Sequence, residues 1–200
     1  MPATIQAVCC NEAWSAGYCK GAQLPIMRGK TDQGFTLIEL LIVVAIISII
    51  AAIAVPGLLR ARMTGNETSA IASLKVTTSS QVAYSASCGN GGYAATYIVL
   101  GTPIVAGSEP FISADLGLSA TPQKSGYNFT MTAGAAAAGP NDCLARATNS
   151  GYYGTAIPQT FGSTGTRAFA VNAGNTIWQS TTVAAPAEPF AASATVSPIQ

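Results

Sequence analysis

One glutamate, Glu39, is the residue of this 200-residue chain whose type and position most clearly indicate a specific chemistry. It stands near the start of an otherwise apolar stretch that runs to Val55. A charge in the middle of a bilayer costs roughly 2.5–3.5 kcal/mol on insertion scales, so this carboxylate needs a partner. The stretch can span a membrane, because about 20 apolar residues cover a hydrocarbon core ~30 Å thick. We therefore expect a chain that sits in lipid and is built to assemble.

Residues that could carry out a reaction are poorly represented. The chain has no histidine, which is the commonest general base and metal ligand. It has no phosphate-binding loop, dinucleotide fingerprint or nucleophile elbow, and its many serines and threonines lack an evident activating base. Three acids, Glu109, Asp115 and Asp142, could converge on calcium, but we favour surface acids. The sequence thus predicts a protein that is not an enzyme, with no metal site and no cofactor.

The composition is apolar and close to neutral. Apolar residues make up 49% of the chain and charged residues 8%, against about 25% charged in typical soluble domains. The membrane stretch explains part of this imbalance, and an Ala-, Gly-, Ser- and Thr-rich second half typical of exported proteins explains the rest. After residue 34, six basic side chains balance six acidic ones. Without a basic patch, no nucleic acid is expected as a partner.

The segment Gly34-Phe35-Thr36-Leu37-Ile38-Glu39, with its continuation to Pro56, resembles the N-terminal signature of type IV prepilins and of type II secretion pseudopilins. In that family a peptidase cuts after a glycine, the next phenylalanine is N-methylated, and a glutamate stands fifth in the mature chain. The resemblance implies processing between Gly34 and Phe35. It also implies that Glu39 pairs with the amino terminus of a neighbouring subunit and so sets the register of assembly. A proline in the family's long helix corresponds to Pro56.

The same resemblance implies partners and a location. The partners are further copies of the chain, the prepilin peptidase and N-methyltransferase, an assembly ATPase and an inner-membrane platform protein. The precursor would sit in the bacterial inner membrane with its globular domain outside the cytoplasm, and the mature chain in a filament in the periplasm or at the cell surface. We expect a structural subunit of a type IV pilus-like filament.

Three alternatives stay open. Within the family, the alternative is a type II secretion pseudopilin that drives protein export. In a different class, the helix would merely anchor an extracytoplasmic binding module. A secretory signal peptide cut after Ala54 would instead release a secreted protein, although secretory apolar regions are usually shorter, about 7–15 residues.

By this resemblance residues 1–34 are a leader, which is long for the family. Met27 opens what looks like a complete short leader. Its basic residues, Arg28 and Lys30, would hold that end in the cytoplasm by the positive-inside rule. We therefore expect translation to start at Met27, with a genuinely long leader as the alternative.

The implied cleavage site divides the five cysteines between the leader and the mature chain. Three of the five precede it, which leaves Cys88 and Cys143 in the mature chain. An even pair in an oxidising compartment favours a disulfide. The bridge would close a loop of about 55 residues, nominally worth ~4 kcal/mol in the chain-entropy model. The alternative is two unpaired, small apolar residues.

One long helix is predicted from about residue 35 to about residue 87. Residues 35–55 form the membrane-spanning half, and Pro56 predicts a kink because it lacks an N–H. Residues 56–88 form an amphipathic half, whose other face carries polar residues that include Arg60 and Glu67. Its apolar positions recur at spacings of three, four and seven residues: Leu59, Met63, Ala70, Ile71, Leu74, Thr78 and Val82.

Residues 89–182 predict a globular β-domain of short strands between turn signals. With the helix laid across it, a sheet of about four antiparallel strands gives a two-layer α+β fold. Residues 172–175 predict a tight hairpin turn. A further short strand is expected at 97–100 and a helical turn at 112–118. The Ala/Pro-rich tail, 183–200, is expected to be mobile or an extended strap over the sheet. The four strands are predicted at 127–132, 143–148, 166–172 and 175–180.

Overall fold

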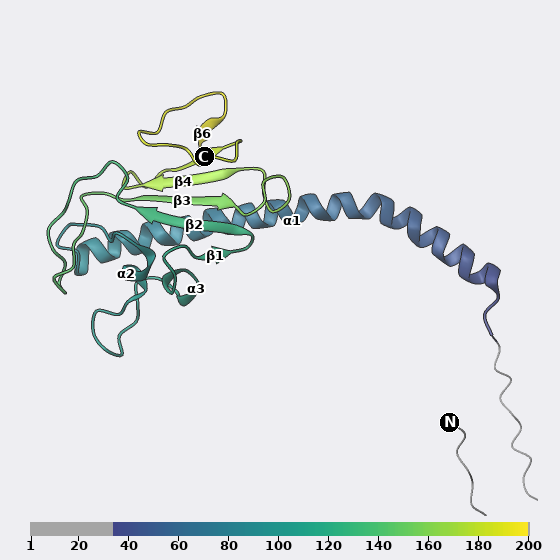
Figure 1. Ribbon diagram of the computed structural model, residues 1–200, viewed down its shortest axis with the longest axis horizontal. Helices are drawn as coiled ribbons and strands as arrows, with labels where there is room; N and C mark the ends of the chain where they lie inside the picture. Colours follow the sequence, from purple (N-terminus) through teal and green to yellow (C-terminus); the bar gives the residue numbers. More distant parts are fainter. Residues whose placement is uncertain (1–33, 200) are drawn as a thin grey trace, which may run out of the picture. The chain divides into compact units, whose positions relative to one another are not determined.

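The computed structural model describes residues 34–199 (Figure 1). The chain divides into two compact units, Met1–Val43 and Val44–Gln200, and the boundary falls within the first helix. The rest of the predicted leader, with Met27, Arg28 and Lys30, lies outside the described residues.

Three helices and one six-stranded sheet make up the described part of the chain. The helices are α1 (Leu37–Ser87), α2 (Tyr97–Gly101) and α3 (Ala114–Gly117). All neighbouring strands are antiparallel, and their order in space equals their order in sequence. The strands are β1 (Gln123–Lys124), β2 (Tyr127–Thr132), β3 (Tyr153–Pro158), β4 (Ala168–Asn172), β5 (Ile177–Ser180) and β6 (Val196–Pro198).

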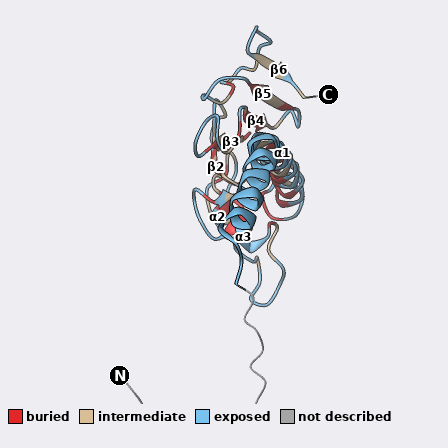
Figure 2. Ribbon diagram, turned by 90° about the vertical axis from the view of Figure 1, so that its right-hand side faces the viewer, coloured by how far each residue is buried: buried red, intermediate tan, exposed pale blue. Residues whose placement is uncertain are grey.

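The core lies between the second half of α1 and one face of the sheet (Figure 2). Side chains alternate across a strand, and in β2 the residues Tyr127, Phe129 and Met131 are buried while their neighbours are not. From the helix, Ala70 and Leu74 join the same core cluster. The result is the predicted two-layer α+β architecture, with six strands rather than the expected four.

The buried face of α1 differs in part from the predicted apolar face. Ala70 and Leu74 are buried as expected, whereas Leu59 and Val82 are exposed. Glu67, predicted on the polar outer face, is buried because Thr166 and Arg167 supply it with partners. The buried residues of α1 are Glu67, Ala70, Ser73, Leu74, Thr77, Ser80, Gln81 and Tyr84.

A buried side-chain amide on α1, that of Gln81, binds the backbone of a later segment of the chain. Gln81 is fully buried, and its side chain acts as both donor and acceptor toward Ala94. Its Nε2 donates to the carbonyl oxygen of Ala94 at 2.9 Å, and its Oε1 accepts from the N–H of Ala94 at 2.9 Å. Because a buried amide without partners is costly, this paired arrangement fixes where the chain returns along the helix.

The strand predictions were right where the local pattern was strong. Residues 127–132 are β2, and the expected strands at 166–172 and 175–180 contain β4 and β5. The predicted hairpin turn is confirmed, since the N–H of Asn175 donates to the carbonyl oxygen of Asn172 at 2.9 Å. The helical turn expected at 112–118 contains α3.

Two predicted strands were wrong. Residues 97–100 lie in α2, and residues 143–148 form a turn around Asp142. That turn is closed by the carboxylate, whose Oδ1 accepts from the N–H of Leu144 and of Arg146. Ala145 has a φ of 60°, which no strand permits. Three strands of the structure were not predicted: β3 and the short strands β1 and β6.

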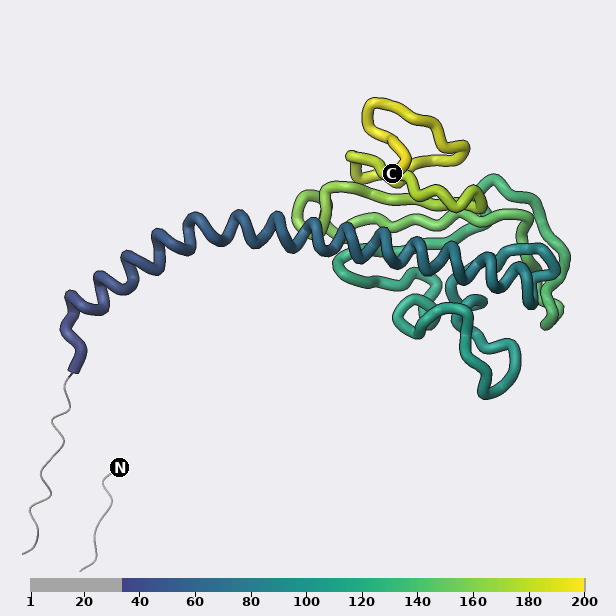
Figure 3. The backbone as a smooth tube through the Cα atoms, turned by 180° about the vertical axis from the view of Figure 1, so that it is seen from behind, coloured from purple at the N-terminus to yellow at the C-terminus, as the bar shows by residue number. Residues whose placement is uncertain are grey.

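The tail is a strap, the second of the two alternatives. Strand β6 pairs with β5, so the last residues extend the sheet (Figure 3). Ahead of β6, the ring of Phe190 lies 5.5 Å from that of Trp178. The hydroxyl of Tyr153 donates to the carbonyl oxygen of Pro186 at 2.6 Å. The Glu188 carboxylate accepts from the Asn172 side chain at 2.8 Å.

Candidate assembly site

Helix α1 begins with a capping box that includes Glu39. Thr36 is the residue before the helix, and its N–H and hydroxyl both donate to Glu39 Oε2, at 2.9 and 2.8 Å. In return, the N–H of Glu39 donates to Thr36 Oγ1 at 3.2 Å. Such a reciprocal pair satisfies N–H groups that a helix start leaves without partners. Glu39 Oε1 accepts no hydrogen bond from residues 34–199, so one carboxylate oxygen faces outward.

The predicted cleavage point lies just before this cap. Residues 34–36 are not helical, and Gly34 is exposed. Phe35 is 92% exposed. A Cβ built on Gly34 would meet no atom within 4 Å, so nothing in the described chain requires glycine there. An exposed, non-helical segment is the kind of backbone that proteases reach.

The surface of α1 is exposed from its start to Leu59, and after Glu39 it is apolar apart from Ser48. Every residue from 34 to 62 is exposed. Among the described residues, α1 is the one helix long and apolar enough to cross a membrane. A helix that is apolar all round is stable only in lipid or against other apolar surfaces. Helix α1 includes Pro56, and Figure 1 draws α1 as one continuous helix. The predicted kink stays a prediction.

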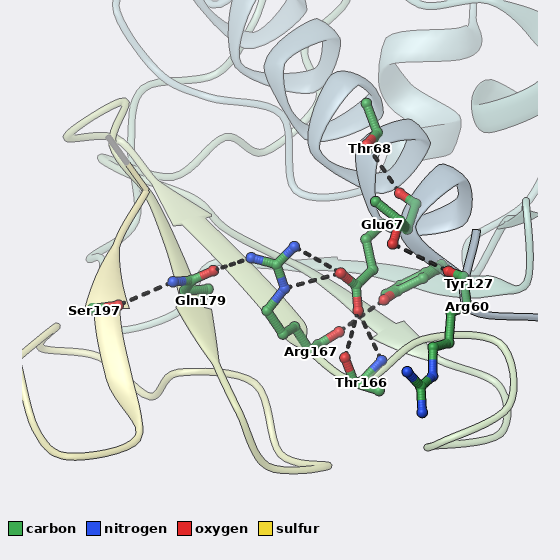
Figure 4. A network of polar contacts seen from close by, with 9 residues as sticks. Arg60, Glu67, Thr68, Tyr127, Thr166, Arg167, Gln179 and Ser197 are labelled. Carbon is green, nitrogen blue, oxygen red and sulfur yellow. Dashed lines mark hydrogen bonds and ion pairs between the residues drawn. The ribbon is translucent and has the colours of Figure 1, made fainter. Parts of the chain in front are cut away.

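The joint between α1 and the sheet is an ion pair, Glu67–Arg167 (Figure 4). Glu67 Oε2 accepts from Arg167 Nε at 2.9 Å and from Nη2 at 2.7 Å. Glu67 Oε1 accepts from the N–H and hydroxyl of Thr166 at 2.8 and 2.9 Å. Arg167 also reaches Gln179 on β5, which donates to Ser197 on β6. One buried carboxylate on the helix is thereby linked to the segment just before β4 and, through Arg167 and Gln179, to β5 and β6.

The charge of Glu67 is stabilised by these contacts. Burial by itself raises the pKa of the Glu67 carboxyl, but the hydrogen bonds from Thr166 and Arg167 and the guanidinium charge outweigh burial. Its pKa is therefore lowered from the ordinary value. Arg167 is held on its other side by the Phe169 ring, whose centroid lies 5.6 Å from the guanidinium carbon.

The other end of α1 is fastened by a disulfide and a buried acid. Cys88 and Cys143 are bonded, with their Cα atoms 4.8 Å apart. Beside them, Asp142 accepts from the Tyr84 hydroxyl at 2.7 Å and from Arg146 Nε at 2.6 Å. Burial alone raises the pKa of the Asp142 carboxyl, but hydrogen bonds from Tyr84, Arg146 and Leu144 lower it to about 2. Burial raises the pKa of Tyr84 to about 12.

The acids considered for calcium do not converge. Asp115 pairs with Lys124 at 2.5 Å, and Asp142 pairs with Arg146. Within residues 34–199, no group of three or more Cys, Asp or Glu side chains is placed to hold a metal ion. The described acids are therefore engaged in structure or exposed on the surface.

Two features were missed from the sequence. The capping box could have been found, because Thr36 and Glu39 have the Thr-x-x-Glu spacing directly ahead of an apolar run. The Glu67–Arg167 pair gave no local signal, since its members are 100 residues apart.

Comparisons with known proteins identify the N-terminal part of this arrangement. The family described as "Prokaryotic N-terminal methylation motif" matches residues 29–55. A relative, the type IV wide pilus major component PilA4 of Thermus thermophilus, is 59% identical over 39 residues. That match covers 20% of this chain and 30% of the relative. No solved structure matches the chain.

The methylation motif falls on the cap and the exposed apolar helix, and the fold is a long helix on an antiparallel sheet. These findings together support the assignment of the chain to the type IV pilin family.

Proposed function

We propose that the chain is a structural subunit of a type IV pilus-like filament. A peptidase removes the leader after Gly34, the new N-terminus at Phe35 is methylated, and the mature chains assemble through the first half of α1. The observation that carries this proposal is the methylation motif over residues 29–55, because its residues 37–55 form the first part of α1, where every residue is exposed. The role is structural rather than catalytic.

The assembly step follows from the physics of that helix. In the membrane its apolar surface faces lipid, and in the filament it faces the same surface of neighbouring copies. Glu39 then selects the register, because an unpaired carboxylate in a low-dielectric environment is strongly penalised and a neighbour's terminal amine offsets that penalty. The arrangement of the cap supports this role, since Oε2 serves the helix and Oε1 is left for a partner.

A pseudopilin that drives protein export is the second candidate, because the methylation motif is shared by both kinds of subunit. The similarity to a component named for a wide pilus favours the pilus. The precursor would wait in the inner membrane, with an assembly ATPase and a platform protein extracting it. Surface filaments seen by electron microscopy on cells that express the chain would separate the pilus from the export machine.

The deciding experiment is the mass of the N-terminal peptide of the mature protein from isolated membranes. The proposal expects a peptide that begins at Phe35 and is heavier by one methyl group. An N-terminus at Val55, or one retained in the leader without methylation, would indicate a secreted or merely anchored protein and overturn the proposal.

A variant then tests the role of Glu39. Glu39→Ala should insert into the membrane and be cleaved, yet form few filaments or none. Glu109→Ala is the matched control, since Glu109 is an exposed acid with no hydrogen bond or ion pair within the described chain. Normal filament yield from Glu39→Ala would refute the register role.

A further inference from the structure

Two arginines follow directly on the apolar part of α1. Residues 40–59 contain no charged side chain, and Arg60 and Arg62 come next. Both are exposed. The three ion pairs found within residues 34–199 use Lys124, Arg146 and Arg167, so neither Arg60 nor Arg62 has a carboxylate partner there. Because successive helical residues are about 100° apart, the two guanidinium groups leave α1 on different sides.

The connection between β3 and β4, residues 159–167, lies against the helix at this level. The side-chain amide of Asn66 donates to the carbonyl oxygen of Thr164 at 2.9 Å. Gly162 and Ser163 line a shallow groove of about 270 Å³ together with Pro56, Leu59, Arg60 and Met63. Phe161, at the tip of this connection, is 42% exposed. Arg60, Arg62 and Phe161 therefore share the end of the domain from which the apolar helix emerges; we name these three residues the rim.

The electrostatic character of the rim is positive. Within the connection between β3 and β4, the one charged residue is Arg167, which is paired with Glu67. The nearest acid along the helix after the arginines is Glu67, which is buried and paired with Arg167. Nothing on this end of the domain therefore neutralises the two arginines or repels an anion.

We propose that, before assembly, the rim rests on the extracytoplasmic surface of the inner membrane, and that Arg60 and Arg62 bind the phosphates of anionic phospholipids. This inference rests on the proposed function, in which the apolar half of α1 spans the bilayer. Twenty helical residues rise about 30 Å, the thickness of the hydrocarbon core, so Arg60 and Arg62 come out at the headgroups. A guanidinium matches phosphate oxygens with paired donors, and an exposed aromatic ring suits the interface.

The strength of this contact can be bounded. A basic residue near an anionic membrane surface shifts the equilibrium toward the surface by roughly fivefold. Two arginines together shift the ratio of bound to free domain by about 25-fold. The interaction is electrostatic, so it weakens at high salt.

The experiment uses the mature, full-length protein in lipid nanodiscs. Ser163→Cys places a single free thiol beside the rim, because Cys88 and Cys143 are bonded to each other. A bimane dye on this thiol is quenched by a phospholipid that carries a spin label on its headgroup. Quenching should be clearly stronger in nanodiscs with one third phosphatidylglycerol than in phosphatidylcholine alone.

Further variants show which residues cause the dependence on phosphatidylglycerol. Arg60→Gln with Arg62→Gln should abolish the dependence on phosphatidylglycerol, and either single change should lower the ratio of bound to free domain roughly fivefold. Lys75→Gln is the matched control, an exposed cation about 22 Å further along the helix, and it should leave the quenching unchanged.

Three results would overturn the inference. The first is equal quenching in both lipids, and the second is a dependence on phosphatidylglycerol that survives the double arginine change. The third is quenching that rises with the number of protein copies per nanodisc at fixed lipid composition, which would assign the rim to a second copy of the chain. Failure of the proposed function shows separately, as an N-terminal peptide that does not begin at Phe35.

Discussion

Glu67→Ala removes the carboxylate that joins α1 to the sheet, and the structure sets the size of the loss. The Glu67 side chain is 6% exposed and accepts four hydrogen bonds, two from Thr166 and two from Arg167. Removing one partner of a buried ion pair costs about 3–5 kcal/mol. The Arg167 side chain is 35% exposed and keeps its bond to Gln179. Water therefore replaces part of the lost contact, and we expect about 3 kcal/mol less unfolding free energy.

The loss can be measured on the mature protein in detergent by denaturant unfolding. Trp178 on β5 reports the transition, since the other tryptophan precedes residue 34. A loss of about 3 kcal/mol corresponds to a midpoint temperature lower by roughly 6–12 °C for a domain of this size. Glu67→Gln keeps the shape but not the charge and should lose less. Glu109→Gln should stay within about 0.5 kcal/mol of the original protein.

The pH dependence gives an independent check. Because the pKa of Glu67 is lowered in the folded protein, its contribution is present above the ordinary value of 4.5 and is lost as the pH falls through the folded-state value. The difference between the original protein and Glu67→Ala should therefore shrink in acid. If Glu67→Ala were no less stable at pH 7 than Glu109→Gln, the joint would not be what holds the helix to the sheet.

Three further predictions concern the other end of the helix and the cleavage point. Asp142→Asn should lower the unfolding free energy by about 2–3 kcal/mol at pH 7. Because the pKa of Asp142 is about 2 in the folded protein against an ordinary 3.8, this loss should fade as the pH falls from 3.8 to 2. An unchanged loss at pH 2 would contradict the prediction. Replacing Cys88 and Cys143 by serine should cost about 4 kcal/mol, and a reductant should bring the original protein to the same denaturation midpoint unless the bridge contributes nothing. Gly34→Leu should leave the fold intact, because a Cβ there meets no atom within 4 Å, yet block leader removal; cleavage at the usual rate, seen in the N-terminal mass, would refute it.

The parts of the fold that could be predicted are those with a strong local pattern. The apolar run predicted α1, and the alternation of large and polar residues from 127 to 132 predicted β2. Strand β3 was missed because Gly154 and Ala156 look like loop residues. Both are nevertheless buried in β3, and a Cβ on Gly154 would meet Val171 at 3.4 Å and Leu74 at 4.0 Å, which are ordinary contact distances.

The errors came from contacts between distant parts of the chain. Glu67 looked like a surface residue until Arg167, far along the sequence, neutralised it. Residues 143–148 looked extended, yet the Asp142 carboxylate binds two N–H groups of that segment and closes it into a turn. At the assembly site, the position of Glu39 could be predicted from its spacing. That Glu39 Oε2 belongs to the helix cap while Oε1 accepts no hydrogen bond within residues 34–199 could be seen only in the folded structure.

The two edge strands of the sheet, β1 and β6, affect how copies of the chain interact at high concentration. At one border β1 has two residues, and at the other β6 has three and ends in Pro198. A long, flat border strand offers unpaired backbone groups to any other chain, whereas short strands and proline deny them. Copies concentrated in one filament would meet at very high local density. With both borders blunted, such copies would be steered away from amyloid-like strand addition.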